Sequence, residues 1–452
     1  MNLAKLFGTD GIRGIAGKWL SSQMALDFGL AVGTQIKKKW GHATVAIGRD
    51  TRVSSSMLEA AVAAGLCNAG VDVNLLGVVP TPAVSFAVLR GNLKGGVMIS
   101  ASHNSFEYNG LKVFKFSGEK YDDDEELELE ALMQSKQYEY AESKDIGSIY
   151  DDHTTRVEYI DFIKKRLRNL FKTLNKKPKI AIDCANGSAS ATARFIFCAL
   201  NAEVNILNQA PNGFNINAGC GSTKIEALKH FVVDNSYDLG LAFDGDADRC
   251  LVVDKKGCVL SGDHILLAIA KMLKKEQKLK SNTLVVTSMS NLGFIEEATK
   301  LGFNVVTTDV GDRYIFKKMV EIGACLGGED SGHLISLNDA RTGDGQLTAC
   351  LFLEAIDKLG LSFDDLYPQF EEYPQVFKSV CVRDKQAVLQ DARVQECIFK
   401  IKETLGNTGR VLVRASGTEP LIRILVEGKD EKLLNESSNC IAELIEERFG
   451  IN

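Results

Sequence analysis

The stretch ATVAIGRDTRVSSSMLEAAVAAGLCNAGVDVNLLGVV, residues 43–79, decides the fold class. Residues 43–50 are rich in strand-forming side chains, and they are followed by a helical stretch that Ser54 can cap and Gly70 can end. The continuous apolar run 71–79 is typical of a strand covered on both faces. Strand, helix and strand in this rhythm predict a largely parallel sheet with helices packed on it.

The same rhythm restarts twice further along the chain, beginning with KPKIAIDCANGSAS and with TLVVTS. From about Tyr373 the pattern changes to two strands around a glycine-containing turn, followed by an amphipathic helix over 431–449. We therefore predict an α/β protein with three similar α/β domains, built on mixed sheets, and a smaller C-terminal α+β domain. The expected boundaries of these four domains are 1–150, 151–255, 256–370 and 371–452.

Composition excludes several classes of protein. The 452 residues are 45% hydrophobic and 25% charged with only seven prolines, which is typical of a soluble globular chain and not of a disordered or fibrous one. No apolar run reaches the ~18 residues of a membrane span, and the N-terminus lacks a secretory signal, so we expect a cytoplasmic location. The net charge is −6 without a long basic block, which argues against nucleic acid or an anionic membrane as partner.

Two further composition features are interpreted as structural. The eleven cysteines occur singly with no CxxC pair, so we expect buried small side chains and not disulfides or a zinc site. The acidic run YDDDEELELE, residues 121–130, is interpreted as the solvated face of a helix and not as a site.

The strongest chemical signal is FDGDADR, in which Asp244, Asp246 and Asp248 follow an apolar strand. Such a loop can turn three carboxylates toward one point and hold a hard divalent cation such as Mg²⁺. An EF-hand is excluded, because its glycine and glutamate positions fall on Arg249 and Lys255. A solvated turn is the remaining alternative, but three crowded acids would repel one another without a cation.

A second polar group, SASHN, follows the apolar strand that ends near residue 100. Sites of open α/β sheets gather at the carboxyl ends of the strands, and Ser102 is the better candidate nucleophile of the two serines. A turn or helix cap is the alternative. A serine hydrolase is poorly supported, because GxSxG is absent and His103 is adjacent to Ser102. Lys112, ten positions on, would by itself be interpreted as a surface residue.

A third group, GGEDSGH, places Glu329, Ser331 and His333 between glycines. Such a loop can bring a carboxylate, a hydroxyl and an imidazole to a polyhydroxy ligand, and His333 can act as acid or base near neutral pH. A tight connection between two strands explains the same residues equally well.

The fourth group, RASGTEP, lies between two strands, with a further arginine beyond it. Arginine side chains, hydroxyls and exposed backbone amides together make a phosphate clamp, although no Walker motif is present. A plain hairpin would need neither arginine. The candidate phosphate ligands are Arg414, Ser416, Gly417, Thr418 and Arg423.

Taken together, these residues resemble the α-D-phosphohexomutase superfamily, whose signature motifs appear here in the family's order and spacing across the whole chain. Phe7–Gly14, the stretch GCGST (Gly219–Thr223) and the overall length are most similar to the bacterial members that act on an amino sugar phosphate. The five matching stretches are FGTDGIRG (Phe7–Gly14), ISASHN (Ile99–Asn104), DGDADR (Asp244–Arg249), GGEDSGH (Gly327–His333) and RASGTEP (Arg414–Pro420).

The resemblance implies a mechanism. Ser102 matches the serine that carries a phosphoryl group in the active enzyme, and the three aspartates match the residues that hold one Mg²⁺ together with it. Lys112 and His333 match residues that assist proton transfer, while Arg13 and Arg249 line the phosphoserine site. The resemblance further implies that sugar hydroxyls contact Glu329 and Ser331, and that the substrate's other phosphate contacts Arg414, Ser416 and Thr418.

The implied reaction interconverts glucosamine 6-phosphate and glucosamine 1-phosphate through a 1,6-bisphosphate, and it feeds UDP-N-acetylglucosamine and cell-wall synthesis. The family's four domains surround a central cleft, and we expect a hinge before about residue 370 that lets the intermediate reorient. The expected partner is a small sugar phosphate, and the chain could be a monomer or a homodimer. Mannose or glucose phosphates, a metal-dependent phosphatase and a non-catalytic sugar-phosphate sensor remain alternatives.

Three positions depart from the family pattern. Ser105 and Tyr108 stand where the family has proline and aspartate, and without the fixed φ of proline we expect a more mobile serine loop. Ala247 replaces a common glycine, which requires either a negative φ or absorbed strain.

Overall fold

The computed structural model describes residues 6–8, 10–416 and 420–451, and the chain divides into two compact units. The first unit contains Met1–Met289 and Gly302–Gln369. The second contains Phe370–Asn452 together with Ser290–Leu301, a segment far away in sequence. Among the described helices, none combines the length and the apolar composition that a membrane span requires.

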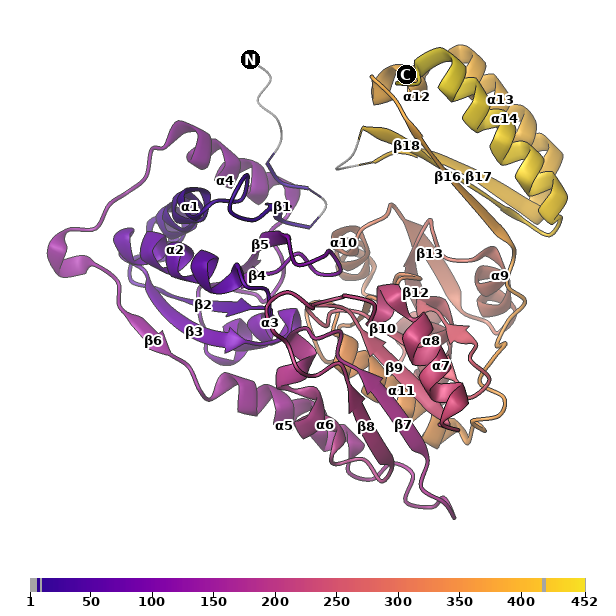
Figure 1. The fold of residues 1–452 in the computed structure, drawn as a ribbon, viewed down its shortest axis with the longest axis horizontal. Helices are drawn as coiled ribbons and strands as arrows, with labels where there is room; N and C mark the ends of the chain where they lie inside the picture. The colour runs from indigo at the N-terminus through magenta and orange to yellow at the C-terminus, as the bar shows by residue number, and fades with distance from the viewer. Residues whose placement is uncertain (1–5, 9, 417–419, 452) are drawn as a thin grey trace. The chain divides into compact units, whose positions relative to one another are not determined.

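The first sheet of unit 1 is mixed, with a parallel centre and an antiparallel edge (Figure 1). Val45 and Ile47 of its strand β2 point into the core shared with helices α1 and α2, while Gly48 lies against α3. This alternation explains why β2 can be apolar throughout: both of its faces are covered. The strand order is β1 (Ile12–Ile15), β5 (Tyr108–Lys115), β4 (Gly95–Ile99), β2 (Thr44–Arg49), β3 (Asp72–Val78) and β6 (Ile149–Asp151).

Helices α1 and α2 pack with their backbones in contact. A Cβ at Gly29 would overlap the carbonyl oxygen of Val62, and one at Gly65 would overlap that of Leu26. Only glycine at both crossing positions allows this approach. The helices of this region are α1 (Ser22–Trp40), α2 (Ser55–Asn68), α3 (Thr81–Arg90), α4 (Asp123–Ser135) and α5 (Thr155–Leu167), with the 3₁₀ turn η1 (Ser143–Asp145).

The second sheet of unit 1 pairs β7 with β8 and β9 in parallel, and then continues antiparallel through β10 and β11. Helix α7 covers one face around Leu228 and Val232. The elements are β11 (Val259–Leu260), β10 (Cys250–Asp254), β9 (Leu239–Phe243), β7 (Lys179–Asp183), β8 (Glu203–Leu207), α6 (Ala193–Phe197), α7 (Glu226–Asp234), η2 (Ser188–Ala191) and η3 (Ser222–Lys224).

The third sheet of unit 1 has β12 parallel to β13 and β14, and an antiparallel edge strand β15. The buried helices α8 and α11 pack against each other, and both also contact the second sheet. The elements are β13 (Asn304–Thr308), β12 (Thr283–Thr287), β14 (Leu326–Gly328), β15 (Leu334–Ser336), α8 (Gly262–Lys275), α10 (Asp312–Ile322), α11 (Gly345–Leu359) and η4 (Lys280–Asn282).

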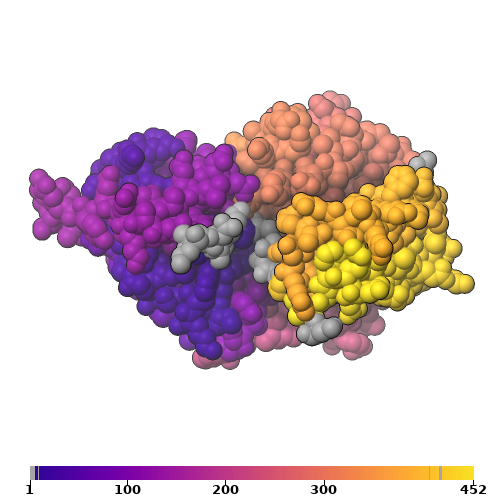
Figure 2. Space-filling view, turned by 90° about the horizontal axis from the view of Figure 1, so that it is seen from above, coloured from indigo at the N-terminus to yellow at the C-terminus, as the bar shows by residue number. Residues whose placement is uncertain are grey.

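Unit 2 is an antiparallel sheet whose helices α13 and α14 form the orange and yellow surface in Figure 2. The predicted helix 431–449 agrees with α14 at both ends. The elements are β16 (Gln375–Cys381), β18 (Leu421–Gly428), β17 (Gly409–Ala415), α9 (Leu292–Lys300), α12 (Lys385–Gln390), α13 (Ala392–Leu405), α14 (Glu431–Phe449) and η5 (Gly406–Thr408).

The α/β class with mixed sheets is confirmed, but the interpretation of the acidic run is wrong in part. Residues 123–130 do belong to a helix, α4 (Asp123–Ser135), and its start is capped by Asp122. However, Glu126 and Glu130 are buried. Glu126 forms an ion pair with Arg313 at 2.9 Å, and Glu130 accepts the backbone N–H of Leu6 at 3.1 Å. Charge density alone could not show that two of these acids have buried partners.

The contact between α1 and α2 can be tested with Gly65→Ala. Alanine favours a helix over glycine, yet we expect a loss of about 1–3 kcal/mol in the free energy of unfolding, because the new methyl group must push the helices apart. The exposed neighbour serves as control: Ala64→Gly should cost about 1 kcal/mol through helix propensity alone. Urea unfolding measures both, and a stabilised Gly65→Ala variant would refute the close contact.

Candidate active site

Ser102 lies at the start of the loop that follows β4 and is 1% exposed. Its φ of +52° is in the left-handed region, so surrounding contacts must hold a strained backbone. The Ser102 hydroxyl donates to Asp244 Oδ2 at 2.6 Å, and its backbone N–H donates to the Ser100 hydroxyl at 2.9 Å. The structure thus places the candidate nucleophile directly beside the acidic loop.

The three aspartates follow β9 and are all buried, with carboxylate oxygens within 4.8 Å of one another. One oxygen of Asp246 and one of Asp248 are buried without a hydrogen-bond partner. Burial, and then the charges of Asp248 and Asp246, raise the pKa of Asp244 well above its usual range. Unpartnered oxygens and crowded carboxylates are what a divalent cation would satisfy, so the donor set fits a metal ion.

Small residues allow this loop to approach the serine. A Cβ at Gly245 would overlap the carbonyl oxygen of Ser102. Ala247 has a φ of +56°. Of the two conditions stated for alanine at this position, a negative φ or absorbed strain, the second therefore applies. Two hydrogen bonds hold this conformation: the Ala247 N–H donates to Asp244 O at 3.1 Å, and its carbonyl accepts from Gly345 at 3.0 Å.

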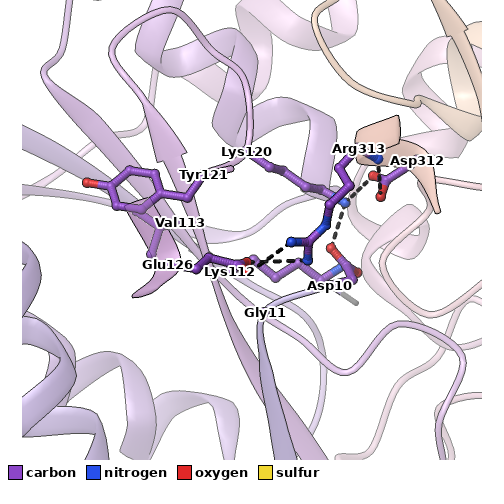
Figure 3. Close-up of a pocket in the computed structure, with 9 residues that line it drawn as sticks. All are labelled: Asp10, Gly11, Lys112, Val113, Lys120, Tyr121, Glu126, Asp312 and Arg313. Atoms are coloured by element: carbon purple, nitrogen blue, oxygen red, sulfur yellow. Dashed lines mark hydrogen bonds and ion pairs between the residues drawn. The ribbon is translucent and has the colours of Figure 1, made fainter. Parts of the chain in front are cut away.

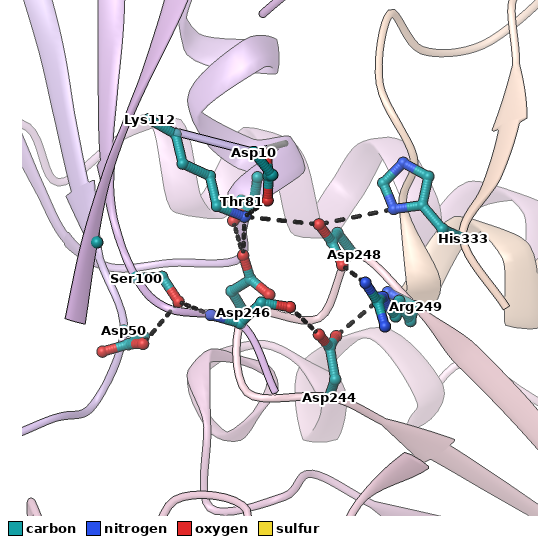
Figure 4. Close-up of polar contacts among 12 residues, drawn as sticks. Asp10, Asp50, Thr81, Ser100, Lys112, Asp244, Asp246, Asp248, Arg249 and His333 are labelled. Atoms are coloured by element: carbon teal, nitrogen blue, oxygen red, sulfur yellow. Dashed lines mark hydrogen bonds and ion pairs between the residues drawn. The ribbon is translucent and has the colours of Figure 1, made fainter. Parts of the chain in front are cut away.

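Lys112 of β5 is buried and points into the acidic loop (Figure 4). Its Nζ lies 2.9 Å from Asp246 Oδ2 and 2.8 Å from Asp10 Oδ2. Burial alone would lower the pKa of Lys112, but these two carboxylates raise it above its usual value. Thr81, at the start of α3, donates to the same Asp246 oxygen at 2.5 Å. Lys112 is therefore a protonated partner of the acidic loop and not a surface residue.

Two arginines and a histidine belong to the motifs around the serine and the acidic loop. Arg249 donates its backbone N–H to Asp244 at 3.2 Å, and its Nε lies 3.9 Å from Asp248. Arg13, on β1, pairs with Asp10 at 2.5 Å. Burial, and then Arg249 and Arg13, lower the pKa of His103 to about 4. His103 is therefore neutral near neutral pH, and the charges of both arginines act on it.

The loop between β14 and β15 carries the third group of predicted residues. The Glu329 carboxylate accepts two hydrogen bonds, one from the Gly311 N–H at 3.1 Å and one from the Ser331 hydroxyl at 3.4 Å. His333 is buried, with Nδ1 3.6 Å from Asp248 and Nε2 3.5 Å from Asp312. Burial would lower the pKa of His333, but Asp248 and Asp312 raise it. The segment is both a strand connection and a part of the site.

Sequence reasoning missed three residues that link Lys112 to His333. Lys120 lies 2.7 Å from Asp10 and 2.6 Å from Asp312, inside the pocket drawn in Figure 3. Asp10 belongs to the motif FGTDGIRG, but no local signal marks Asp312, and nothing near Lys120 distinguishes it from a surface lysine. With Asp248 the chain of ion pairs closes into a ring of alternating charge: Lys112, Asp10, Lys120, Asp312, His333 and Asp248.

The fourth group of residues belongs to unit 2, at the β17–β18 connection. Arg414 and Arg423 are cross-strand partners in the antiparallel register. This register brings two guanidinium-bearing residues together on neighbouring strands. Ser416 is buried, and its carbonyl accepts from Lys385 Nζ at 2.7 Å. Gly417 and Thr418 lie outside the described residues.

The strain at Ala247 can be measured against a buried alanine of normal geometry, Ala242 in β9. We expect Ala247→Gly to be more stable than Ala242→Gly by about 1–2 kcal/mol, because glycine releases the left-handed strain only at position 247. Urea unfolding of both variants gives the comparison. Equal losses would show that Ala247 is unstrained.

Comparisons with known proteins agree across the whole chain. Four models of the phosphoglucomutase/phosphomannomutase family match in sequence order: α/β/α domain I at residues 4–140, α/β/α domain II at 157–257, α/β/α domain III at 261–373 and the C-terminal domain at 378–444.

Relatives of similar length are found in several bacteria. Phosphoglucosamine mutases of Desulforamulus reducens and Bacillus subtilis are 45% and 41% identical over 446 and 451 residues, covering 98% and 99% of this chain and 99% and 100% of theirs.

Solved structures share the fold. A phosphoglucomutase/phosphomannomutase family protein from Burkholderia thailandensis has a TM-score of 0.79 at 22% identity and covers 100% of both chains. Aspergillus fumigatus N-acetylphosphoglucosamine mutase, in complex with GlcNAc-6P and magnesium, has a TM-score of 0.73 at 17% identity and covers 98% of this chain and 95% of that one. The resemblance found in the motifs is confirmed: the chain belongs to the phosphoglucomutase/phosphomannomutase family.

Proposed function

We propose that this enzyme interconverts glucosamine 6-phosphate and glucosamine 1-phosphate, with Ser102 as the phosphoryl carrier and a 1,6-bisphosphate as intermediate. The observation that carries the proposal is the 2.6 Å hydrogen bond between the Ser102 hydroxyl and Asp244, inside a buried group of three carboxylates. The bacterial relatives named phosphoglucosamine mutase, at 41–45% identity over nearly full length, support the choice of sugar.

Asp244, Asp246 and Asp248 would hold one Mg²⁺ together with the phosphorylated Ser102. When bound, the ion neutralises charge on the phosphoryl group, which is the main requirement of phosphoryl transfer. The unpartnered oxygens of Asp246 and Asp248 support this assignment. Arg13 and Arg249, whose charges both act on His103, would supply further positive charge for the phosphate.

The first transfer breaks the bond between Ser102 Oγ and phosphorus and forms a bond from phosphorus to a sugar oxygen. The sugar hydroxyl loses a proton, and Ser102 Oγ regains one. The raised pKa values of Lys112 and His333 favour the protonated forms, which suits both residues to stabilise negative charge. Their role in assisting proton transfer is part of the proposal. The second transfer reverses these bonds at the other end of the sugar and restores the phosphoserine.

Glu329 and Ser331 are proposed to accept and donate hydrogen bonds to sugar hydroxyls. Arg414, Ser416 and Arg423, with Gly417 and Thr418, would hold the phosphate that is not being transferred. Guanidinium groups suit phosphate because they can donate two parallel hydrogen bonds, and the cross-strand register brings the two arginines together.

Further assignments are also proposals. The four-domain division at 150, 255 and 370 and a hinge before residue 370 are proposed for the reorientation of the intermediate; the boundary between the two units at Gln369 supports the hinge position. The cytoplasmic location and the choice between monomer and homodimer stay predictions from the sequence.

Ser102→Ala tests the phosphoryl carrier. The variant should fold but lose mutase turnover by at least about 10³-fold, because no other group can accept the phosphoryl group. Intact mass should show a phosphoryl group on a fraction of the wild-type chains and none on the variant. Ser105→Ala, in the same loop, should keep both turnover and phosphorylation. Turnover by Ser102→Ala at the wild-type rate would contradict the proposal and favour a different carrier.

The substrate class is tested by assaying glucosamine 6-phosphate, glucose 1-phosphate and mannose 1-phosphate in parallel, with inorganic phosphate measured in the same samples. We expect the highest kcat/KM for the amino sugar and almost no phosphate release. A clear preference for a neutral sugar would contradict the assigned substrate. Phosphate release equal to sugar-phosphate consumption would identify a phosphatase instead.

A further inference from the structure

Arg52 follows β2 and is a fully buried arginine whose five N–H donors serve the serine loop and one carboxylate. Its side chain has 0% exposure and pairs with Asp50 Oδ2 through Nε at 2.8 Å. The two Nη atoms donate to four backbone carbonyl oxygens of the loop after β4: those of Ser102, Asn104 and Tyr108, each at 2.9 Å, and that of Ser105. One side chain therefore spans the loop from its nucleophile to the start of β5.

Asn217, from the segment between β8 and α7, contacts the same loop from the other side. Its Nδ2 donates to the carbonyls of Ser102 at 2.9 Å and Asn104 at 3.0 Å. The Ser102 carbonyl thus accepts hydrogen bonds from two buried side chains that come from different parts of the chain.

The residues on both sides of Arg52 are also held in place. The Thr51 hydroxyl donates to the Asn186 carbonyl at 2.6 Å, and the Val53 N–H donates to the Gly213 carbonyl at 2.9 Å. Gly213 belongs to the segment that contains Asn217, and Asn186 follows Ala185, whose carbonyl accepts the Asn217 N–H at 2.9 Å. The backbone around Arg52 is therefore bonded to the same part of the second sheet's loops as Asn217.

We propose that Arg52 and Asn217 are positioning residues that hold the phosphorylated Ser102 in reach of the sugar and out of reach of water. This inference rests on the proposed function of Ser102 as phosphoryl carrier. Both side chains turn the loop carbonyls into the protein interior, so these oxygens do not face the phosphoryl group, where they would repel it. They also stabilise the left-handed φ of Ser102.

The loop needs this support because its own sequence supplies little rigidity. Ser105 lacks the fixed φ that proline would provide, and its carbonyl is one of the four that Arg52 binds. Hydrogen bonds from a planar, five-donor guanidinium can restrict four peptide groups at once, which the ammonium of lysine cannot.

The position of the loop affects which of two acceptors, the sugar or water, receives the phosphoryl group. In transfer, a sugar oxygen bonds to phosphorus as the Ser102 Oγ–phosphorus bond breaks. In hydrolysis, a water oxygen bonds to phosphorus, Ser102 regains a proton and inorganic phosphate leaves. A loosened loop should favour water, because a misplaced phosphoryl group meets the bound sugar in the wrong geometry. A purely structural role would reduce the amount of folded enzyme without changing the ratio of the two reactions.

The experiment measures that ratio in Arg52→Lys and Asn217→Ala. Full-length enzyme is phosphorylated with glucosamine 1,6-bisphosphate, and phosphoryl content is read by intact mass. Glucosamine 6-phosphate is then added, and inorganic phosphate and glucosamine 1-phosphate are quantified. We expect phosphate released per sugar turnover to rise by about tenfold in Arg52→Lys and to a smaller extent in Asn217→Ala, with kcat falling more than KM changes. Because each ratio is taken per active enzyme, partial unfolding of either variant does not affect it.

Arg49→Lys is the matched control, since Arg49 lies three residues earlier and its side chain pairs with Glu59 of α2 at 2.9 Å. Its ratio should equal that of the wild type. This inference alone would be overturned if the wild type carries the phosphoryl group but phosphate release per sugar turnover is the same in Arg52→Lys, Asn217→Ala and the wild type. A wild-type enzyme that never carries a phosphoryl group on Ser102 would overturn the proposed function and this inference with it.

Discussion

The site depends on one electrostatic constraint: three carboxylates within 4.8 Å of one another, buried beside a serine hydroxyl. Such a group is stable only if positive charge reaches it from elsewhere in the fold. Lys112 comes from β5, Arg249 from the end of the acidic loop itself, and His333 from the connection between β14 and β15. The residues that balance the negative charge of the aspartates come from elements far apart in sequence. The site therefore forms only when these elements have packed together.

The ring of alternating charge extends this compensation beyond the aspartates. Lys120 connects Asp10, in the N-terminal motif, with Asp312, at the start of α10. Each carboxylate of the ring faces cations on both sides, which lowers the pKa of Asp10 and Asp312 despite their burial and keeps both ionised. The same arrangement raises the pKa values of Lys120 and His333, although burial by itself would lower them. The proposed proton-handling groups therefore stand at two points of one connected network.

Backbone geometry is the second constraint. Ser102 and Ala247 both have positive φ, and Gly245 brings its backbone against the Ser102 carbonyl with no room for a Cβ. Strained conformations of this kind persist where surrounding contacts over-determine them. Here the contacts come from Arg52, Asn217 and the N–H of Gly345. The nucleophile is held by residues that take no part in the proposed bond-making steps.

By itself, the sequence determined the class of fold, the approximate bounds of a few elements such as β2, β3 and α14, and the motifs that hold Ser102, the three aspartates and Glu329. These features depend on local periodicity and on residues close together in the chain. Lys120, Arg52 and Asn217 could not be found that way. Each is an ordinary polar residue in its local context, and the contacts that define its role are with partners at least 50 positions away. Only the tertiary structure decided that Glu126 is buried against Arg313 and that α9 belongs with the C-terminal unit. Burial and ion pairing between distant segments are properties of the packed chain, and no local pattern of residues records them.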